Sequence, residues 1–355
     1  MNNDIDPTLL TADFSYDLPP EQIAQSPVEP RESSRLLVLD RHTGQVTHSQ
    51  VANIRDYLRS GDVVVANNSR VIPARLNARR AGSGGAVEIL LLTRKVGGTW
   101  TCMARPAKRL HAGESLIVDS PEGSQLPSGT ITVVQKGREG VIEVTLEPEI
   151  EEQLVHYGAA PLPPYITKEL RDPERYQTVY ATQPGSSAAP TAGLHFSKGL
   201  IESLAPAGIE WAEVTLHIGL DTFRPVTADR VVDHRIHTEW CSVSDEAAAA
   251  IQRARSANRR IIALGTTAAR TLETAAAVWE TGAREGFSTS TSVFITPGYH
   301  WSAVDGMVTN FHLPHSTLLM MVCAFAGRER VLAAYQEAIE ARYRFYSFGD
   351  AMLIV

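Results

Sequence analysis

The sequence predicts a mixed-sheet α/β domain that is interrupted by a small all-β barrel domain. Three observations lead to this fold class. The chain has 355 residues, more than a single domain usually holds. Strand-like and helix-like segments alternate towards both ends of the chain, whereas its middle contains short strand-like runs between glycine-rich turns. We therefore predict a discontinuous α/β domain over residues 1–71 and 151–355, with the barrel inserted at residues 72–150.

The segment before the predicted barrel combines strands with one helix. Apolar patterning predicts strands at Arg35–Asp40 and Gln45–His48, and Thr43-Gly44 between them predicts a hairpin turn. Val51–Arg59 has the period of an amphipathic helix. Asp62–Asn67 is rich in β-branched residues, which is typical of a strand covered on both faces of a sheet.

The middle of the chain carries the strands of the predicted barrel. They are short and are separated by turns such as Gly82-Ser83-Gly84-Gly85. About five or six strands of this length suffice to close a small barrel. The strand candidates are Ala86–Leu92, Thr99–Ala104, Ser115–Asp119, Thr130–Gln135 and Val141–Leu146.

Strands and helices alternate again beyond the predicted barrel. Ser197 and Ser244 precede two of the helices, where a serine hydroxyl can accept a hydrogen bond from a first-turn amide. The predicted helices are Glu151–Tyr157, Lys198–Leu204, Asp245–Ser256, a helix from the Gly265-Thr266-Thr267 turn to about Glu280, Ser316–Ala326 and Glu329–Tyr343. The predicted strands are Ile209–Leu220, His237–Val243, Arg260–Leu264, Ser292–Thr296, Met307–Phe311 and Ala351–Val355.

The composition is that of an ordinary soluble globular protein, with 43% hydrophobic and 21% charged residues. The sequence shows neither an apolar run of roughly 18 residues, which a membrane helix needs, nor the start of a signal peptide. The three cysteines form no CxxC pair, which suits a reducing compartment. The net charge of -7 argues against a protein that coats nucleic acid nonspecifically. We expect a cytoplasmic protein that binds no membrane.

The segment from Ala189 to Phe196, Ala-Pro-Thr-Ala-Gly-Leu-His-Phe, is the first candidate for a functional site. Small residues let a backbone approach a ligand closely, and amides at the start of the following helix attract anionic or lone-pair groups. His195 adds a titratable imidazole to this loop. The alternative is a tight turn with a hydrogen-bonded structural histidine.

Two further segments place polar groups after predicted strands. Gly265-Thr266-Thr267 is similar to an anion-binding turn, but it lacks the lysine of a P-loop, and a plain strand-to-helix connection is the alternative. His217 and Asp221 follow another strand, at the edge of an α/β sheet where ligands bind. A lone histidine at a strand end is also often structural.

Two H-x-x-H pairs, His234 with His237 and His312 with His315, raise the question of a metal site. Zinc needs a third ligand, and the spacing supplies none. We therefore predict no metal.

Basic residues recur near the predicted domain boundary. On one shared face they would form a phosphate-binding track, and otherwise they are solvated surface charge. They are Arg31, Arg35, Arg70, Arg75, Arg79, Arg80, Arg105, Lys108 and Arg109.

Several longer segments together resemble one enzyme family. They are Asn67–Leu76, the Ala189–Phe196 loop, His217–Val226, the Gly-Thr-Thr turn, Thr309–Leu318 and Tyr343–Met352. In this order they are similar to the S-adenosylmethionine:tRNA ribosyltransferase-isomerases of queuosine synthesis. The resemblance runs from Asp13 nearly to the C-terminus.

This resemblance implies a reaction and its partners. The ribosyl part of S-adenosylmethionine is transferred to 7-aminomethyl-7-deazaguanine at the wobble position of a tRNA, giving epoxyqueuosine-tRNA, adenine and methionine. S-adenosylmethionine is then a cosubstrate, and no metal or other cofactor is expected. We expect the enzyme to act as a monomer.

The reaction needs a base, a donor for the adenine leaving group and a dry pocket. Our candidates for acid and base are His195 and His217, with Asp221 as an orienting carboxylate. Tyr16 and Phe196 are candidates for contact with the sulfonium or adenine, although either could be a core residue. The other candidates for cosubstrate binding are Thr191, Gly193, Thr266 and Thr267, and those for the tRNA or its modified base are Asn67, Arg70 and Arg75.

Two other functions are considered. A tRNA-binding module without catalysis would bind tRNA and leave S-adenosylmethionine intact. An S-adenosylmethionine-dependent methyltransferase would release the demethylated thioether, and it is expected to carry a glycine-rich turn after its first strand, a pattern that this sequence lacks.

Overall fold

The computed structural model describes residues 5–95, 97–120, 125–137, 140–219, 225–282 and 284–355. The chain divides into two compact units. Unit 1 comprises residues 1–69, 163–183 and 189–355, and unit 2 comprises residues 70–162 and 184–188. Among the described residues, no helix has the length and apolar character needed to cross a membrane.

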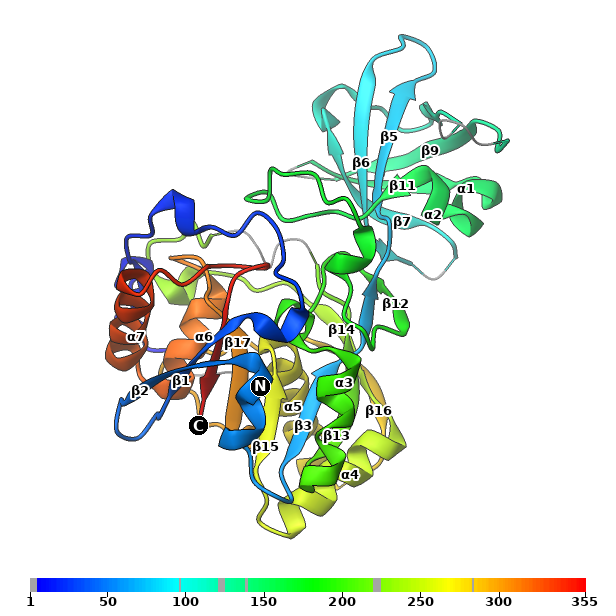
Figure 1. The fold of residues 1–355 in the computed structure, drawn as a ribbon. Helices are drawn as coiled ribbons and strands as arrows, with labels where there is room; N and C mark the ends of the chain where they lie inside the picture. Colours follow the sequence, from blue (N-terminus) through cyan, green and yellow to red (C-terminus); the bar gives the residue numbers. More distant parts are fainter. Residues whose placement is uncertain (1–4, 96, 121–124, 138–139, 220–224, 283) are drawn as a thin grey trace. The chain divides into compact units, whose positions relative to one another are not determined.

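Unit 1 is built on a nine-stranded mixed sheet (Figure 1). Its central strands β13, β3, β15 and β17 run parallel to one another, and the outer β14, β16 and β2 are antiparallel to their neighbours. In spatial order the strands are β16 (Phe287–Thr291), β14 (Glu239–Val243), β13 (Glu210–Leu216), β3 (Val63–Asn67), β15 (Ile261–Leu264), β17 (Gly306–Asn310), β18 (Ala351–Ile354), β1 (Arg35–Leu39) and β2 (Val46–Gln50).

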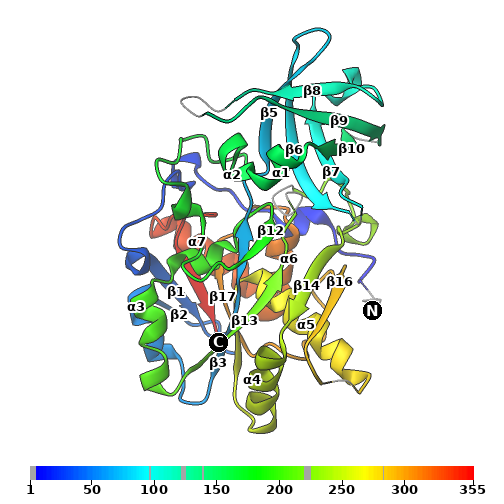
Figure 2. The ribbon, with the colours of Figure 1, turned by 90° about the vertical axis from the view of Figure 1, so that its right-hand side faces the viewer.

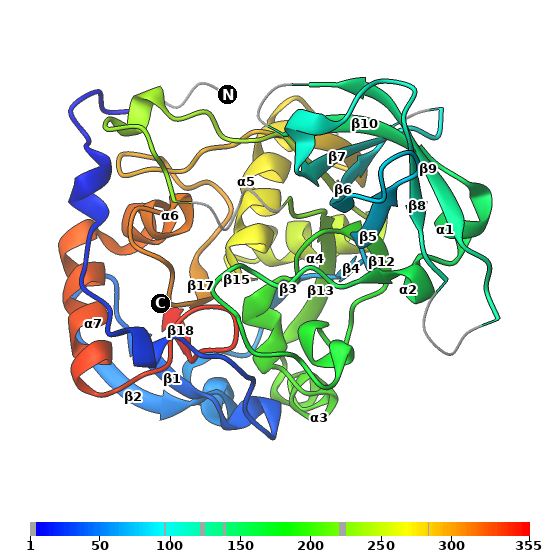
Figure 3. The same ribbon diagram turned by 90° about the horizontal axis from the view of Figure 1, so that it is seen from above.

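Helices cover both faces of this sheet, which explains why every residue of β3 is buried. Val63 and Val65 pack into one core, and their neighbours Val64 and Ala66 into another, as strand alternation requires. The first core receives α4 (Asp245–Ser256), α5 (Thr266–Glu280), α6 (Thr317–Ala326) and α7 (Arg328–Glu340). The second receives α3 (Lys198–Glu202) and the 3₁₀ helix η4 (Val51–Tyr57). Figure 3 shows α5 and α6 on one side of the sheet and α3 on the other.

Unit 2 is a closed antiparallel barrel with its own core (Figure 2). Its strands follow one another as β5 (Arg75–Arg80), β6 (Ala86–Arg94), β7 (Trp100–Arg105), β10 (Val141–Leu146), β9 (Gly129–Lys136) and β8 (Ser115–Val118). Pairing of β8 with β5 closes the barrel, and β11 (Gly158–Ala159) adds to β5. A separate two-stranded sheet pairs β4 (Ser69–Val71) with β12 (Gln183–Ser186).

The predicted fold class, a mixed-sheet α/β domain with an inserted barrel, is confirmed. The compact units divide at slightly different residues from the predicted domains, because the chain after residue 150 still belongs to the barrel unit. Two short helices there, α1 (Pro148–Glu152) and α2 (Leu154–Tyr157), pack on the barrel core through Ile150, Leu154 and Tyr157.

Two predicted elements need correction, and one strand was missed. Val51–Arg59 contains a 3₁₀ helix in place of an α-helix. The predicted strand Ser292–Thr296 is irregular, and the strand at this edge is β16, because residues 287–291 occupy the ladder positions opposite β14. The first barrel strand, β5, was not predicted.

Candidate functional site

A small cavity of about 30 Å³ lies in unit 1, where the carboxyl ends of β15 and β17 meet the start of α5. This is the edge at which ligands bind in α/β sheets. The 3₁₀ helix η7 (Thr191–His195) supplies another wall. The described residues that line the cavity include no Asp, Glu, Lys or Arg, and they are Ala189, Pro190, Thr191, Ala192, Ile218, Gly265, Thr266, Thr267, Thr309, Asn310, His312 and Leu318.

His195 lies behind this wall, 3% exposed, and both of its ring nitrogens have partners. Nε2 lies 3.1 Å from the amide nitrogen of Asn310, and Nδ1 lies 2.9 Å from Oγ of Ser34. The Asn310 amide nitrogen can only donate, so Nε2 accepts and Nδ1 carries the proton. Ser34 in turn donates to the carbonyl of Arg31. His195 is therefore held as a neutral imidazole of one defined tautomer.

Asn310 connects this histidine to the cavity. Its Oδ1 accepts from the Thr191 hydroxyl at 2.9 Å, and its Nδ2 also donates to the carbonyl of Tyr346. Burial, with the nearby positive charge of Arg344 as a smaller cause, lowers the pKa of His195 to about 3. Asn310, which was not a predicted site residue, thus connects Thr191 with His195.

His312 is a second buried imidazole, and it lines the cavity. Its Nε2 lies 2.6 Å from Oγ1 of Thr309, and burial lowers its pKa to about 3. The hydroxyl of Tyr16 donates to the carbonyl of His312, and Tyr335 accepts from its amide. Tyr16, predicted to contact the cosubstrate, therefore supports the backbone of His312 and also packs edge-on against Tyr335.

Two glycines shape the backbone at the cavity: Gly265 lines it, and Gly193 follows the lining residues Thr191 and Ala192. A Cβ at Gly193 would lie 2.0 Å from the hydroxyl of Tyr180, so the chain can pass there only without a side chain. Gly265 has φ +96°, a conformation that glycine adopts at little cost, and it turns the chain from β15 directly into α5. Thr266 and Thr267 then begin α5 at the cavity wall.

His217 lies just beyond the end of β13, in a different setting. Its ring stacks on Trp240 with centroids 4.9 Å apart, and its amide donates to the Trp240 carbonyl. Its Nδ1 is buried and has no partner within the described part of the chain. Burial lowers the pKa of His217. Its neighbour Ile218 lines the cavity, whereas His217 is not among the described residues that do so.

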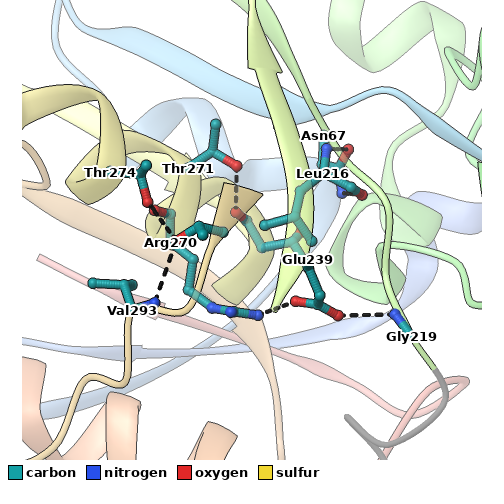
Figure 4. Close-up of polar contacts among 10 residues, drawn as sticks. Asn67, Leu216, Gly219, Glu239, Arg270, Thr271, Thr274 and Val293 are labelled. Atoms are coloured by element: carbon teal, nitrogen blue, oxygen red, sulfur yellow. Dashed lines mark hydrogen bonds and ion pairs between the residues drawn. The ribbon is translucent and has the colours of Figure 1, made fainter. Parts of the chain in front are cut away.

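A buried ion pair fixes the chain beyond His217 (Figure 4). Glu239 and Arg270, whose side chains are 7% and 6% exposed, pair between the start of β14 and α5. Glu239 also accepts from the amide of Gly219 at 2.8 Å. One carboxylate therefore ties the His217–Gly219 segment to the helix whose first turn lines the cavity.

The remaining predicted site residues lie elsewhere. Phe196 is fully buried and packs on Trp211 in the second core. Asn67 is also buried, and its amide joins the ends of β3 and β13 through bonds with both the N–H and the carbonyl of Leu216. Asp221 lies outside the described residues.

Arg70 and Arg75, the two arginines predicted to contact the tRNA or its modified base, belong to the barrel unit. Arg70 is half-buried on β4, and Arg75 on β5 lies 3.7 Å from a carboxylate oxygen of Glu88. Two further arginines of β5 also face carboxylates, Arg79 with Asp119 and Arg80 with Glu114.

The site residues that the sequence analysis missed are Thr309 and Asn310, at the end of β17, and His312 beyond it. The segment was already visible as part of the family resemblance, but His312 was weighed only as a metal ligand. Within the described ranges, no three His, Cys, Asp or Glu residues cluster as a metal site would require.

The fold and the cavity define a class of protein: an α/β protein with an inserted barrel and an uncharged, polar cavity at the ends of its parallel strands. The model of the queuosine biosynthesis protein family matches residues 11–354. The chain belongs to this family, which confirms the resemblance seen in the sequence.

Relatives of known name match along almost the whole chain. The S-adenosylmethionine:tRNA ribosyltransferase-isomerase of Desulfitobacterium hafniense is 48% identical over 343 residues, covering 97% of this chain and 99% of that protein. The protein of the same name from Heliobacterium modesticaldum is 50% identical over 344 residues, covering 96% and 98%. The crystal structure of S-adenosylmethionine tRNA ribosyltransferase from Thermotoga maritima is similar with a TM-score of 0.55 and 38% identity, covering 97% of this chain and 100% of that one.

Proposed function

We propose that this protein transfers and isomerises the ribosyl part of S-adenosylmethionine onto 7-aminomethyl-7-deazaguanine at the wobble position of tRNA. The products are epoxyqueuosine-tRNA, adenine and methionine. The observation that carries the proposal is the match, at 48–50% identity and over at least 96% of the chain, to enzymes named for ribosyl transfer to tRNA. The match covers both compact units.

The cavity supports this chemistry because it provides an uncharged polar wall, beside which a bound cosubstrate can transfer a proton and release adenine. Its polar lining is neutral, since burial keeps His312 unprotonated near pH 7. Ribosyl transfer starts when a base removes a proton from the 5′-carbon beside the sulfonium. Loss of this proton opens the ribose ring, and adenine leaves. Attack by the aminomethyl nitrogen and closure of the epoxide then expel methionine.

We assign the two predicted histidines different tasks in this reaction. His217 has a ring nitrogen without a partner among the described residues, next to Ile218 of the cavity wall, and serves as the base that takes the proton. His195 has both nitrogens engaged and serves as a positioning residue, which holds Asn310 and, through it, Thr191. Asp221 is retained as the carboxylate that orients a histidine.

Arg70 and Arg75 of the barrel unit are proposed to contact the tRNA backbone, because arginine is suited to phosphate. Asn67 is better suited to hold the sheet together, since its amide is buried and bonded. No metal or second cofactor takes part in the proposed reaction. We also propose that the enzyme works as a monomer in the cytoplasm, where its tRNA substrate is found.

The proposed function is tested with purified protein, S-adenosylmethionine and a tRNA that carries the aminomethyl base. Release of adenine and methionine in equal amounts, dependent on this tRNA, is the expected result. A tRNA with unmodified guanine at the wobble position is the matched control. Tight tRNA binding without adenine release would indicate a binding module, and release of the demethylated thioether would indicate a methyltransferase. Either outcome refutes ribosyl transfer.

A further inference from the structure

The first turn of α5 lines the cavity and brings the amides of a helix start to it. This 15-residue helix begins after Gly265, and no described side chain caps it. By contrast, Ser244 caps α4 and Ser316 caps α6, each accepting from a first-turn amide. The amides that begin a helix need acceptors, and the helix dipole makes this end positive. The cavity beside Gly265, Thr266 and Thr267 is where an acceptor would be placed.

The Thr267 hydroxyl gives a second, independent indication of a ligand. The residue is 7% exposed, and Oγ1 is buried without any partner in the described part of the chain. A Cβ built on Gly265 would lie 3.7 Å from Thr267 Oγ1, which places the hydroxyl beside Gly265 of the cavity wall. Buried hydroxyls in proteins nearly always have a hydrogen-bond partner, so this one is expected to find its partner in a bound molecule.

The rest of the lining favours an anion as this partner. The polar side chains opposite α5 are already bonded to one another or to the chain behind them, as Thr191 is to Asn310 and Thr309 is to His312. Acidic side chains are absent among the described lining residues, so a negative group meets no repulsion there. A cation such as a sulfonium or ammonium is disfavoured at the positive end of a helix.

We propose that the start of α5 binds the α-carboxylate of S-adenosylmethionine, with the Thr267 hydroxyl and the first-turn amides as its donors. This inference rests on the proposed function, because the carboxylate is the one anionic group of that cosubstrate. A tRNA phosphate is the other anion that the reaction offers. The size of the cavity disfavours a phosphate, since a cavity of about 30 Å³ admits a small terminal group more easily than a phosphodiester within a chain.

The test compares S-adenosylmethionine with its decarboxylated analogue in wild type and three variants. Thr267→Val keeps the shape and removes the hydroxyl, Thr267→Ala shortens the side chain, and Thr267→Ser retains the hydroxyl as the matched control. A hydrogen bond to a charged group is expected to be worth about tenfold in affinity. Thr267→Val and Thr267→Ala should therefore bind S-adenosylmethionine about tenfold more weakly, bind the decarboxylated analogue as wild type does, and leave the KM for tRNA unchanged. Thr267→Ser should behave as wild type.

Affinities are measured by titration calorimetry, independently of turnover, and adenine release is measured in parallel. Equal losses for both compounds, or no loss for either, would overturn the carboxylate assignment. A raised KM for tRNA with unchanged cosubstrate binding would also overturn it, in favour of a phosphate. If calorimetry shows that the variants bind S-adenosylmethionine more weakly but bind the decarboxylated analogue as wild type does, and no adenine is released, the proposed function is refuted and the carboxylate site is retained. Because both Thr267→Val and Thr267→Ala lack the hydroxyl, the test still works if one of the two variants fails to fold.

Discussion

His195 and His217 were equal candidates in the sequence, yet they occupy opposite kinds of environment. His195 is enclosed, and its two nitrogens are engaged by Asn310 and Ser34. His217 is half-buried, lies against a tryptophan that is 42% exposed, and keeps one nitrogen without a partner among the described residues. A base needs an available lone pair, and a positioning residue needs fixed neighbours. The number of free ring nitrogens therefore separates the two histidines better than their place in a distinctive loop.

The largest effect is expected when His217 is replaced by alanine. Removal of a general base typically lowers the rate about 10²–10⁴-fold, so adenine release should fall at least about 100-fold. The melting temperature should change little, because no hydrogen bond of the ring within the described residues is lost. Chromatography of released adenine and a thermal melt check the two statements. A near-normal rate in a folded variant would falsify the assignment of His217 as base.

Glu239→Gln tests whether the buried ion pair supports the His217 segment. It leaves Arg270 buried without its counter-charge, which is expected to cost about 3–5 kcal/mol of stability. Urea unfolding measures this loss. The double variant Glu239→Leu with Arg270→Met should regain most of the stability, since apolar residues of similar volume often replace a buried pair well. The double variant should nevertheless release adenine more slowly than wild type, because the amide of Gly219 has lost its acceptor. Full activity in the double variant would show that the pair has a purely structural role.

His195→Ala should act mainly on stability and on cosubstrate binding. It leaves one Asn310 N–H buried without a partner, which costs about 1–3 kcal/mol, and it removes the donor to Ser34, whose hydroxyl keeps its bond to the Arg31 carbonyl. We expect a lower melting temperature and a raised KM for S-adenosylmethionine, with kcat reduced less than in His217→Ala. His195→Gln, which retains a donor and an acceptor, is the control and should recover part of the loss. If His195→Ala kept its stability and lost kcat alone, the two histidines would have to exchange roles.

The smallest expected effect is a pH dependence of stability. Burial lowers the pKa of both His195 and His312 from 6.5 to about 3. Between these values the unfolded chain binds more protons than the native protein, so stability falls as the pH falls, by about 1.4 kcal/mol per pH unit for each histidine. Urea unfolding at pH values from about 7 down to about 5 measures the slope. His195→Gln should reduce this slope by about 1.4 kcal/mol per pH unit. An unchanged slope would contradict the conclusion that His195 is a neutral imidazole in the native protein.

Most of the fold could be predicted because its elements carry strong local signals. The helix Asp245–Ser256 was predicted with the observed bounds, since Ser244 caps it and its apolar residues keep one period. The barrel strand β5 was missed because its polar positions are Arg75, Asn77 and Arg79, and the two arginines were considered only as basic charges. Its alternation with buried Leu76 and Ala78 was the available signal.

The site was less predictable, because its bonds join segments that are far apart in the sequence. Nothing local to Asn310 shows that its amide connects Thr191 with His195, more than a hundred residues earlier. Phe196 and Asn67 have the side chains of binding residues, and only the packing reveals that both are buried. The family resemblance located the right segments without showing which of their atoms were already bonded.

The position of β18 decides whether the large sheet is one sheet or two. β18 lies between β17 and β1, so that Ala351 lies beside Leu36 in a parallel ladder. Because β17 and β1 are not neighbours, the pairings of residues 351–354 join β1 and β2 to the other strands of this sheet. The barrel unit contains no residue beyond 188, and the pairing of β5 with β8 that closes it involves no part of β18. Removal of residues 351–354 would therefore divide the large sheet and leave the pairings of the barrel in place.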